Sequence, residues 1–250
     1  MRDNTANLAS PSYRLAALDP DFLLADAQRG TRLMLEYEKA EQALLAHAIR
    51  STIVCFGSAR VKEDEPGNHG RWYREARAFG RIASERGGAL DGDGGARYNV
   101  IATGGGPGLM EAANRGATEA GAPSIGFNIT LPHEQEPNGW STPDLTFRFH
   151  YFAVRKLHLA MRAAALVVFP GGFGTLDELF EVVTLQQTQK MHPCPVVLID
   201  RQFWSGLINL DLLVKERLIA PRDVQLFHFA EDAEAAWHII AAGPHRKTQK

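Results

Sequence analysis

Short apolar runs alternate with helical patterns along most of the chain. The runs at 52–56, 99–102, 124–127, 145–149, 165–169 and 195–199 have the length of buried strands. Helical spacing of apolar residues follows at 71–86, 108–120, 154–164 and 175–189, and a last strand and helix are expected within 224–241. Strands that alternate with helices of about ten to fifteen residues are typical of a parallel sheet with helices on both faces. The pattern predicts a Rossmann-like, doubly wound α/β fold.

The same pattern divides the chain into three parts. We predict an N-terminal polar segment and helical extension over 1–50, a Rossmann-like domain over 51–242 and a basic tail over 243–250. Two segments rich in glycine and charge, 61–70 and 87–97, interrupt the rhythm of strands and helices. Because the rhythm resumes after each, we predict that both are surface insertions rather than linkers.

Composition narrows the classes of partner. The formal net charge of the 250 residues is -2, so no overall basic field favours nucleic acid. The N-terminal stretch lacks the basic start and apolar run of a signal peptide, and no segment resembles a membrane span, so we expect a cytoplasmic protein. Cys55 and Cys194 adjoin apolar runs and are expected to be buried thiols. No metal-binding spacing is present, and we expect neither metal nor cofactor.

Three loops that follow predicted strands are unusual: Phe-Gly-Ser-Ala-Arg at 56–60, Thr-Gly-Gly-Gly-Pro-Gly at 103–108 and Pro-Gly-Gly-Phe-Gly-Thr at 170–175. Ligands of parallel α/β sheets bind where such loops gather. Glycines let the backbone approach a ligand closely, and the free amides at a helix start favour an anion. The loops match neither the dinucleotide motif nor the Walker motif. They favour a nucleotide or sugar-phosphate site.

Two charged groups accompany these loops. With Thr175 as the N-cap, Glu178 would occupy the third helical position and close a capping box, although the same position also places a carboxylate beside the predicted phosphate site. Capping and catalysis both remain open. Arg155 and Lys156 begin a helix, where cations oppose the helix dipole. Either a bound anion compensates them or they are solvated, whereas His158 is expected to be a packed or surface residue.

Together, the segment 103–110, the Arg155-Lys156 pair and the segment 170–178 resemble the LOG (Lonely Guy) family of cytokinin riboside 5′-monophosphate phosphoribohydrolases. Members are often filed, misleadingly, as possible lysine decarboxylases. The resemblance covers roughly 51–241, and the N-terminal extension is similar to the longer bacterial branch. It implies hydrolysis of the N-glycosidic bond of a purine nucleoside 5′-monophosphate, giving free base and ribose 5-phosphate. It also implies at least a homodimer, with the site near the subunit interface.

The resemblance further implies that Arg155 and Glu178 are the catalytic pair. It implies substrate contacts by Gly104, Gly105, Gly106, Glu134, Lys156, Gly171, Gly172, Gly174, Thr175 and Thr184. Residues 151–154 depart from the Asp-Met-His of plant-type members, which leaves AMP and a prenylated adenine nucleotide both open as substrates. No pyridoxal-phosphate lysine motif supports decarboxylation. The alternative function is non-catalytic binding of a nucleotide or a molybdenum cofactor, which would not need the Arg155 and Glu178 pair.

Overall fold

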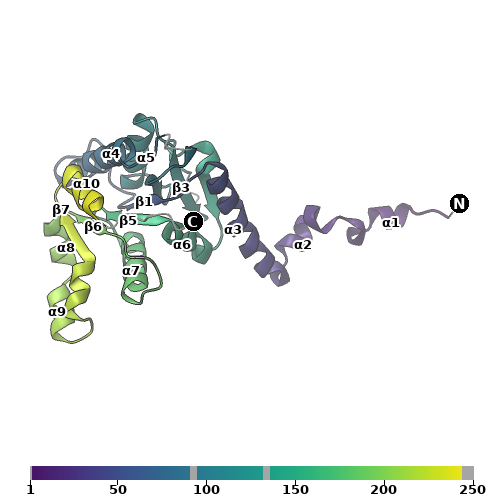
Figure 1. Cartoon of the computed structure of the whole chain (residues 1–250). Coiled ribbons are helices and arrows are strands. Elements are labelled where there is room, and N and C mark those ends of the chain that lie inside the picture. The colour runs from purple at the N-terminus through teal and green to yellow at the C-terminus, as the bar shows by residue number, and fades with distance from the viewer. Residues whose placement is uncertain (1, 91–94, 132–135, 244–250) are drawn as a thin grey trace.

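The computed structural model describes residues 2–90, 95–131 and 136–243, and within them seven parallel strands form one sheet (Figure 1). The strands are β1 (Thr52–Phe56), β2 (Val100–Thr103), β3 (Ser124–Ile129), β4 (Thr146–Phe149), β5 (Ala163–Val168), β6 (Val196–Ile199) and β7 (Phe227–Ala230). Their order is β4-β3-β2-β1-β5-β6-β7. The prediction of a parallel α/β sheet is confirmed.

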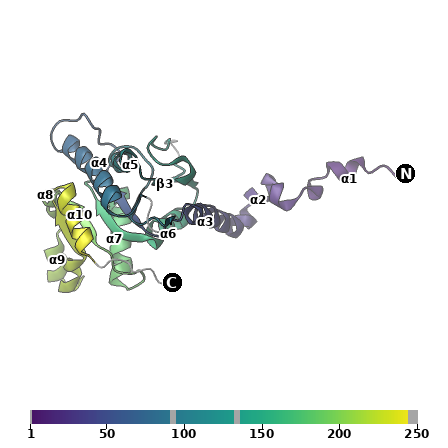
Figure 2. The same cartoon turned by 45° about the horizontal axis from the view of Figure 1, so that its top comes forward.

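Helices cover both faces of the sheet (Figure 2). One face carries α4 (Asn68–Arg86), α5 (Leu109–Glu119) and α10 (Ala233–Ala242), and the other carries α3 (Arg29–Ala46), α6 (Phe152–Met161), α7 (Phe173–Gln187) and α8 (Arg201–Leu207). Alternate side chains of β1 contribute to the hydrophobic cores on the two faces of the sheet. Ile53 and Cys55 face the first set of helices, while Val54 and Phe56 face the second. Both cysteines are buried thiols, as expected.

Two short helices were not predicted. Helix α8 and helix α9 (Leu210–Lys215) follow β6, in a stretch to which the hydrophobic pattern assigned no element. Side-chain caps begin both of them: Asp200 accepts a hydrogen bond from the Phe203 amide at 3.0 Å, and Asn209 accepts one from the Leu212 amide at 2.9 Å. Helices of one to two turns present too few positions for a periodic signal.

The N-terminal extension projects away from the body of the molecule (Figures 1 and 2). It consists of α1 (Thr5–Ala9), α2 (Pro20–Leu24), short 3-10 turns and α3, so the helical extension predicted within 1–50 is interrupted before Arg29. Neither α1 nor α2 contains a buried residue. Helix α3 joins the body through buried Ala40 and Leu44. No helix of the described ranges is long and apolar enough to cross a membrane.

The strand order reverses between β1 and β5. Strand β1 pairs with β2 on one side and with β5 on the other, so the chain winds outward in opposite directions from this point. In open parallel sheets the loops on the two sides of such a reversal separate and leave a crevice for a ligand. The loops that follow β1 and β5 are two of the three singled out in the sequence.

Candidate active site

A pocket of about 610 Å³ lies at the carboxyl ends of β1 and β5. Its wall is made by the loop after β1, the first turns of α6 and α7, and one side of α8. Both Arg155 and Glu178 line it, and so do Gly171, Gly172, Gly174 and Thr175. The structure therefore brings six of the predicted site residues together at the strand-order reversal.

The start of α7 is built around glycine. A Cβ atom on Gly171 would collide with Oγ1 of Thr175 and would lie 3.0 Å from the Ser58 amide nitrogen, so no side chain fits there. Around Gly172 and Gly174, in contrast, nothing lies within 4 Å of where a Cβ would stand. The amides of the first helical turn have no acceptor within the helix, and they occupy the pocket wall. This arrangement favours an anion.

The alternative that Thr175 and Glu178 form a capping box is wrong. Helix α7 begins at Phe173 with Gly172 as its N-cap, and no side chain caps it. Thr175 is consequently the third residue of the helix and Glu178 the sixth, too far along to reach an N-cap amide. The extended backbone of Gly172 starts the helix three residues earlier than a Thr175 cap would, and Thr175 packs against Gly171 instead.

Glu178 instead faces Arg155. Nη1 of Arg155 donates to Oε1 of Glu178 at 3.0 Å, and Nε of the same arginine donates to the carbonyl of Phe127 at 2.8 Å. The two side chains are only 10% and 5% exposed. Two residues that are distant in sequence thus form a buried ion pair at the pocket wall.

Burial alters the protonation of this pair. It raises the pKa of Glu178 to about 7, although the positive charges of Arg155 and Lys156 oppose the rise. Burial also lowers the pKa of Arg155, with Glu178 opposing the fall. An arginine nevertheless keeps its charge at neutral pH. Glu178 is therefore poised to exchange a proton near neutrality, as a catalytic carboxylate requires.

The second glycine loop supports Arg155 from behind. A Cβ on Gly104 would lie 2.7 Å from Nη2 of Arg155, so the absence of a side chain leaves room for the guanidinium. Gly105 has a φ of +69°, and its carbonyl accepts from the Asn138 amide at 2.9 Å. The carbonyl of Gly106 accepts from Nδ2 of Asn138 at 3.0 Å. In the described chain this loop does not line the pocket, and the substrate contacts expected of its glycines stay predictions.

The remaining predicted contacts lie away from the pocket or outside the described residues. Nζ of Lys156 lies 2.8 Å from Asp177 and 3.1 Å from Glu181, so carboxylates of α7 compensate its charge. Thr184 is exposed, further along the same helix. Glu134 lies outside the described residues. Their roles as substrate contacts also stay predictions.

Apolar side chains form a part of the wall that the sequence did not reveal. Phe152, Phe203 and Leu207 line the pocket, and Phe173 at its edge is 92% exposed. Phe203 and Leu207 belong to α8, the helix that periodicity missed, although Asp200 followed by an apolar stretch was a usable capping signal. His158 is buried and packs against Tyr37 with 5.1 Å between ring centroids, as expected for a packed histidine.

Comparison with known proteins identifies the family. The family model described as "Possible lysine decarboxylase" matches residues 110–240, which is more than half of the chain. The chain belongs to this family. It is the LOG family, because curated relatives carry that name. The chain is 28% identical over 159 residues to "Probable cytokinin riboside 5'-monophosphate phosphoribohydrolase LOGL5" of Oryza sativa subsp. japonica, a match that covers 62% of this chain and 59% of the relative. The match thus spans less than two thirds of that relative's length.

Solved structures show the same fold. The X-ray structure of TM1055, a structural-genomics target, has a TM-score of 0.55 and 22% identity, covering 76% of this chain and 98% of that one. The molybdenum cofactor binding protein of the phototrophic bacterium Rippkaea orientalis has a TM-score of 0.50 and 19% identity, covering 78% and 95%. At these identities the likeness concerns the fold alone.

Proposed function

We propose that this protein hydrolyses the N-glycosidic bond of a purine nucleoside 5′-monophosphate and releases the free base and ribose 5-phosphate. The observation that carries the proposal is the buried Arg155 and Glu178 pair, which shares one pocket with the glycine-rich start of α7. The name of the rice relative describes a reaction of this class.

The 5′-phosphate binds at the start of α7 in this proposal. The first-turn amides and the positive end of the helix dipole attract an anion, and open space beside Gly172 and Gly174 lets it approach the backbone. Fixing the phosphate positions the distant glycosidic bond, so binding energy from a non-reacting group assists the reaction.

Glu178 acts at the sugar. Breaking the bond between C1′ and the base nitrogen leaves positive charge on the ribose in an oxocarbenium-like transition state, which the ionised carboxylate stabilises. Water adds to C1′ and loses a proton, for which Glu178, with a pKa of about 7, is a suitable acceptor. The departing base carries the electron pair of the broken bond away and takes a proton from solvent, and Glu178 later returns its proton to solvent. The permanently charged Arg155 orients the nucleotide or stabilises the departing base.

The apolar wall suits the base. Phe152, Phe203 and Leu207 offer flat and aliphatic surface in the same pocket as the polar groups. A volume of about 610 Å³ lies in the usual range for pockets that hold small ligands. This volume accommodates either adenine or a prenylated adenine, and a substrate comparison decides between them.

Two other functions find less support. Non-catalytic carriage of a nucleotide or molybdenum cofactor has the fold of the Rippkaea orientalis protein in its favour, but carriage gives no reason for a buried carboxylate with a raised pKa. Lysine decarboxylation through an imine needs a lysine with a depressed pKa. Burial would lower the pKa of Lys156, yet the hydrogen bonds of Asp177 and Glu181 raise it overall.

A screen of released bases tests the proposal. Purified protein is incubated with AMP, a prenylated adenosine monophosphate and the two corresponding nucleosides, and free base is separated by chromatography. We expect base from a monophosphate and almost none from its nucleoside. Equal turnover of nucleotide and nucleoside would refute the anchoring argument, and a tight ligand that copurifies without base release would favour the carrier.

We further propose that the protein assembles at least into a homodimer. Apolar side chains on the N-terminal extension are well exposed in the single chain, among them Leu15, Leu18 and Leu24 at 70% or more. Such a concentration of exposed apolar residues is typical of a surface that a partner covers.

A further inference from the structure

The loop after β1 lies against the start of α7 and is fixed there. The Ser58 amide donates to the carbonyl of Pro170 at 3.0 Å, and the Ser58 carbonyl accepts from the Leu109 amide at 3.1 Å. A Cβ on Gly108 would collide with the same carbonyl. The loop is thus held between the glycine loop of α7 and the start of α5, and both Ser58 and Arg60 line the pocket.

Among the described residues, Arg60 is the charged residue of this pocket that forms no ion pair. The charged residues of the wall are Arg60, Arg155, Asp177 and Glu178. Arg155 pairs with Glu178, and Asp177 pairs with Lys156. Within 2–90, 95–131 and 136–243, no acidic side chain pairs with Arg60, and its side chain is exposed. One positive charge therefore remains available at the pocket.

A phosphate monoester needs that charge. It carries about -1.5 to -2 charges at neutral pH, whereas a helix N-terminus contributes the equivalent of about half a positive charge. A guanidinium supplies a full charge and two parallel N–H donors that match phosphate oxygens. The α7 amides by themselves would leave most of the phosphate charge uncompensated.

We propose that Arg60 is a further phosphate-binding residue, which binds the substrate's 5′-phosphate together with the α7 amides. Ser58 assists: its Oγ accepts a hydrogen bond from the Arg60 amide at 3.1 Å and keeps its own proton to donate to the phosphate. This inference rests on the proposed nucleotide substrate. Both residues precede the family match at 110–240, so the match does not assign them a role.

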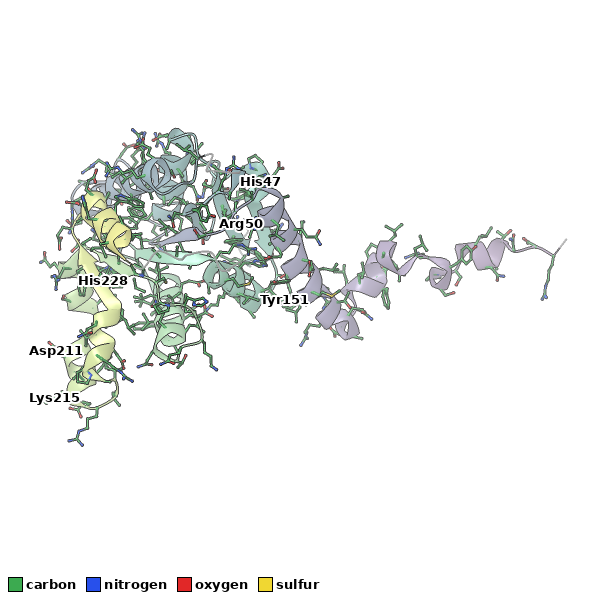
Figure 3. All side chains as sticks on the ribbon, viewed as in Figure 1. His47, Arg50, Tyr151, Asp211, Lys215 and His228 are labelled. Atoms are coloured by element: carbon green, nitrogen blue, oxygen red, sulfur yellow. The ribbon has the colours of Figure 1, made fainter. Side chains whose placement is uncertain are left out.

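Binding of ribose 5-phosphate tests the role without turnover. Its affinity is measured by calorimetry for the wild type, Arg60→Gln, Arg60→Lys and the control Arg50→Gln. Arg50 is also exposed but precedes β1 at the opposite edge of the sheet, near α3 (Figure 3). We expect Arg60→Gln to weaken binding about tenfold, equivalent to about 1.4 kcal/mol, with partial recovery in Arg60→Lys and no change in Arg50→Gln.

Kinetics separate this inference from the function it rests on. If the wild type releases base, Arg60→Gln should raise KM more than it lowers kcat, with an unchanged melting temperature; unchanged KM and unchanged ribose 5-phosphate affinity would overturn the role of Arg60. If no base is released from any monophosphate but Arg60→Gln still weakens ribose 5-phosphate binding, the hydrolase proposal fails and the phosphate site stands. A wild type that neither releases base nor binds ribose 5-phosphate overturns both proposals.

Discussion

The pKa of Glu178 predicts how the proposed reaction depends on pH. Burial raises this pKa to about 7, and the reaction needs the carboxylate ionised, so lowering the pH below 7 removes active enzyme. Each pH unit below the pKa reduces the ionised fraction about tenfold, which leaves roughly a tenth at pH 6 and roughly a hundredth at pH 5. A phosphate bound nearby adds negative charge and moves the acid limb, if anywhere, to higher pH.

The assay is the rate of adenine release from AMP between pH 5 and 9. Saturating AMP is used, because kcat reports the ionisation of groups in the enzyme-substrate complex. The substrate phosphate itself titrates near pH 6 and would distort the pH dependence of kcat/KM. Binding of AMP to Glu178→Gln over the same pH range shows how much of the pH dependence comes from ionisation of the phosphate alone.

Two results would refute this reasoning. An acid limb near 4.5, the ordinary value for glutamate, would mean that burial does not control the ionisation of Glu178. A Glu178→Gln variant with substantial activity and the same acid limb would mean that another group titrates. The prediction is a limb at or above about 7 in the wild type, and its loss together with the activity in the variant.

Three further predictions concern stability and assembly. The folded-state pKa of Glu178 lies above its ordinary value of 4.5, so between about pH 4.5 and 7 the folded protein binds more protons than the unfolded chain. As pH rises through that window, the free energy of unfolding of the wild type should therefore fall by about 3 kcal/mol relative to that of Glu178→Gln. Urea unfolding at pH 4.5 and 8 checks this, and a pH-independent difference would contradict it. Gly171→Ala, whose Cβ collides with Thr175, should cost about 1 to 3 kcal/mol, whereas Gly30→Ala has open space and should not destabilise; equal melting temperatures for the two would oppose the steric argument. Deleting residues 2–18, where no side chain is buried, should leave the melting temperature of the body unchanged but reduce the molar mass in light scattering; an unchanged mass would show that this segment does not hold the assembly together.

The sequence predicts the sheet well because its strands are buried on both faces. Continuous apolar runs such as 52–56 and 165–169, each followed by a segment of helical spacing, indicate buried strands. The structure pairs these two runs as β1 and β5. The site loops follow from the same logic, since parallel strands deliver their loops to one edge. The closeness of Arg155 and Glu178 was implied by family resemblance rather than by spacing.

The details of the site that the sequence did not predict correctly have local physical causes. Capping preference favours Thr175 as the N-cap of α7, but the helix begins at Phe173 with Gly172 as its N-cap, and Gly171 before it fits the tight contact with Ser58 and Thr175. Lys156 looks available for an anion until α7 folds beside it and brings Asp177 within 2.8 Å. Such contacts depend on tertiary packing between elements, which periodicity does not encode.

The most direct measurement of the central claim is adenine release from AMP by the wild type and by Glu178→Gln at pH 8. The two proteins should show matching circular dichroism and bind ribose 5-phosphate equally. We predict that the wild type forms adenine and ribose 5-phosphate in equal amounts and that the variant is slower by about a hundredfold or more. Comparable rates from the two proteins would contradict the account.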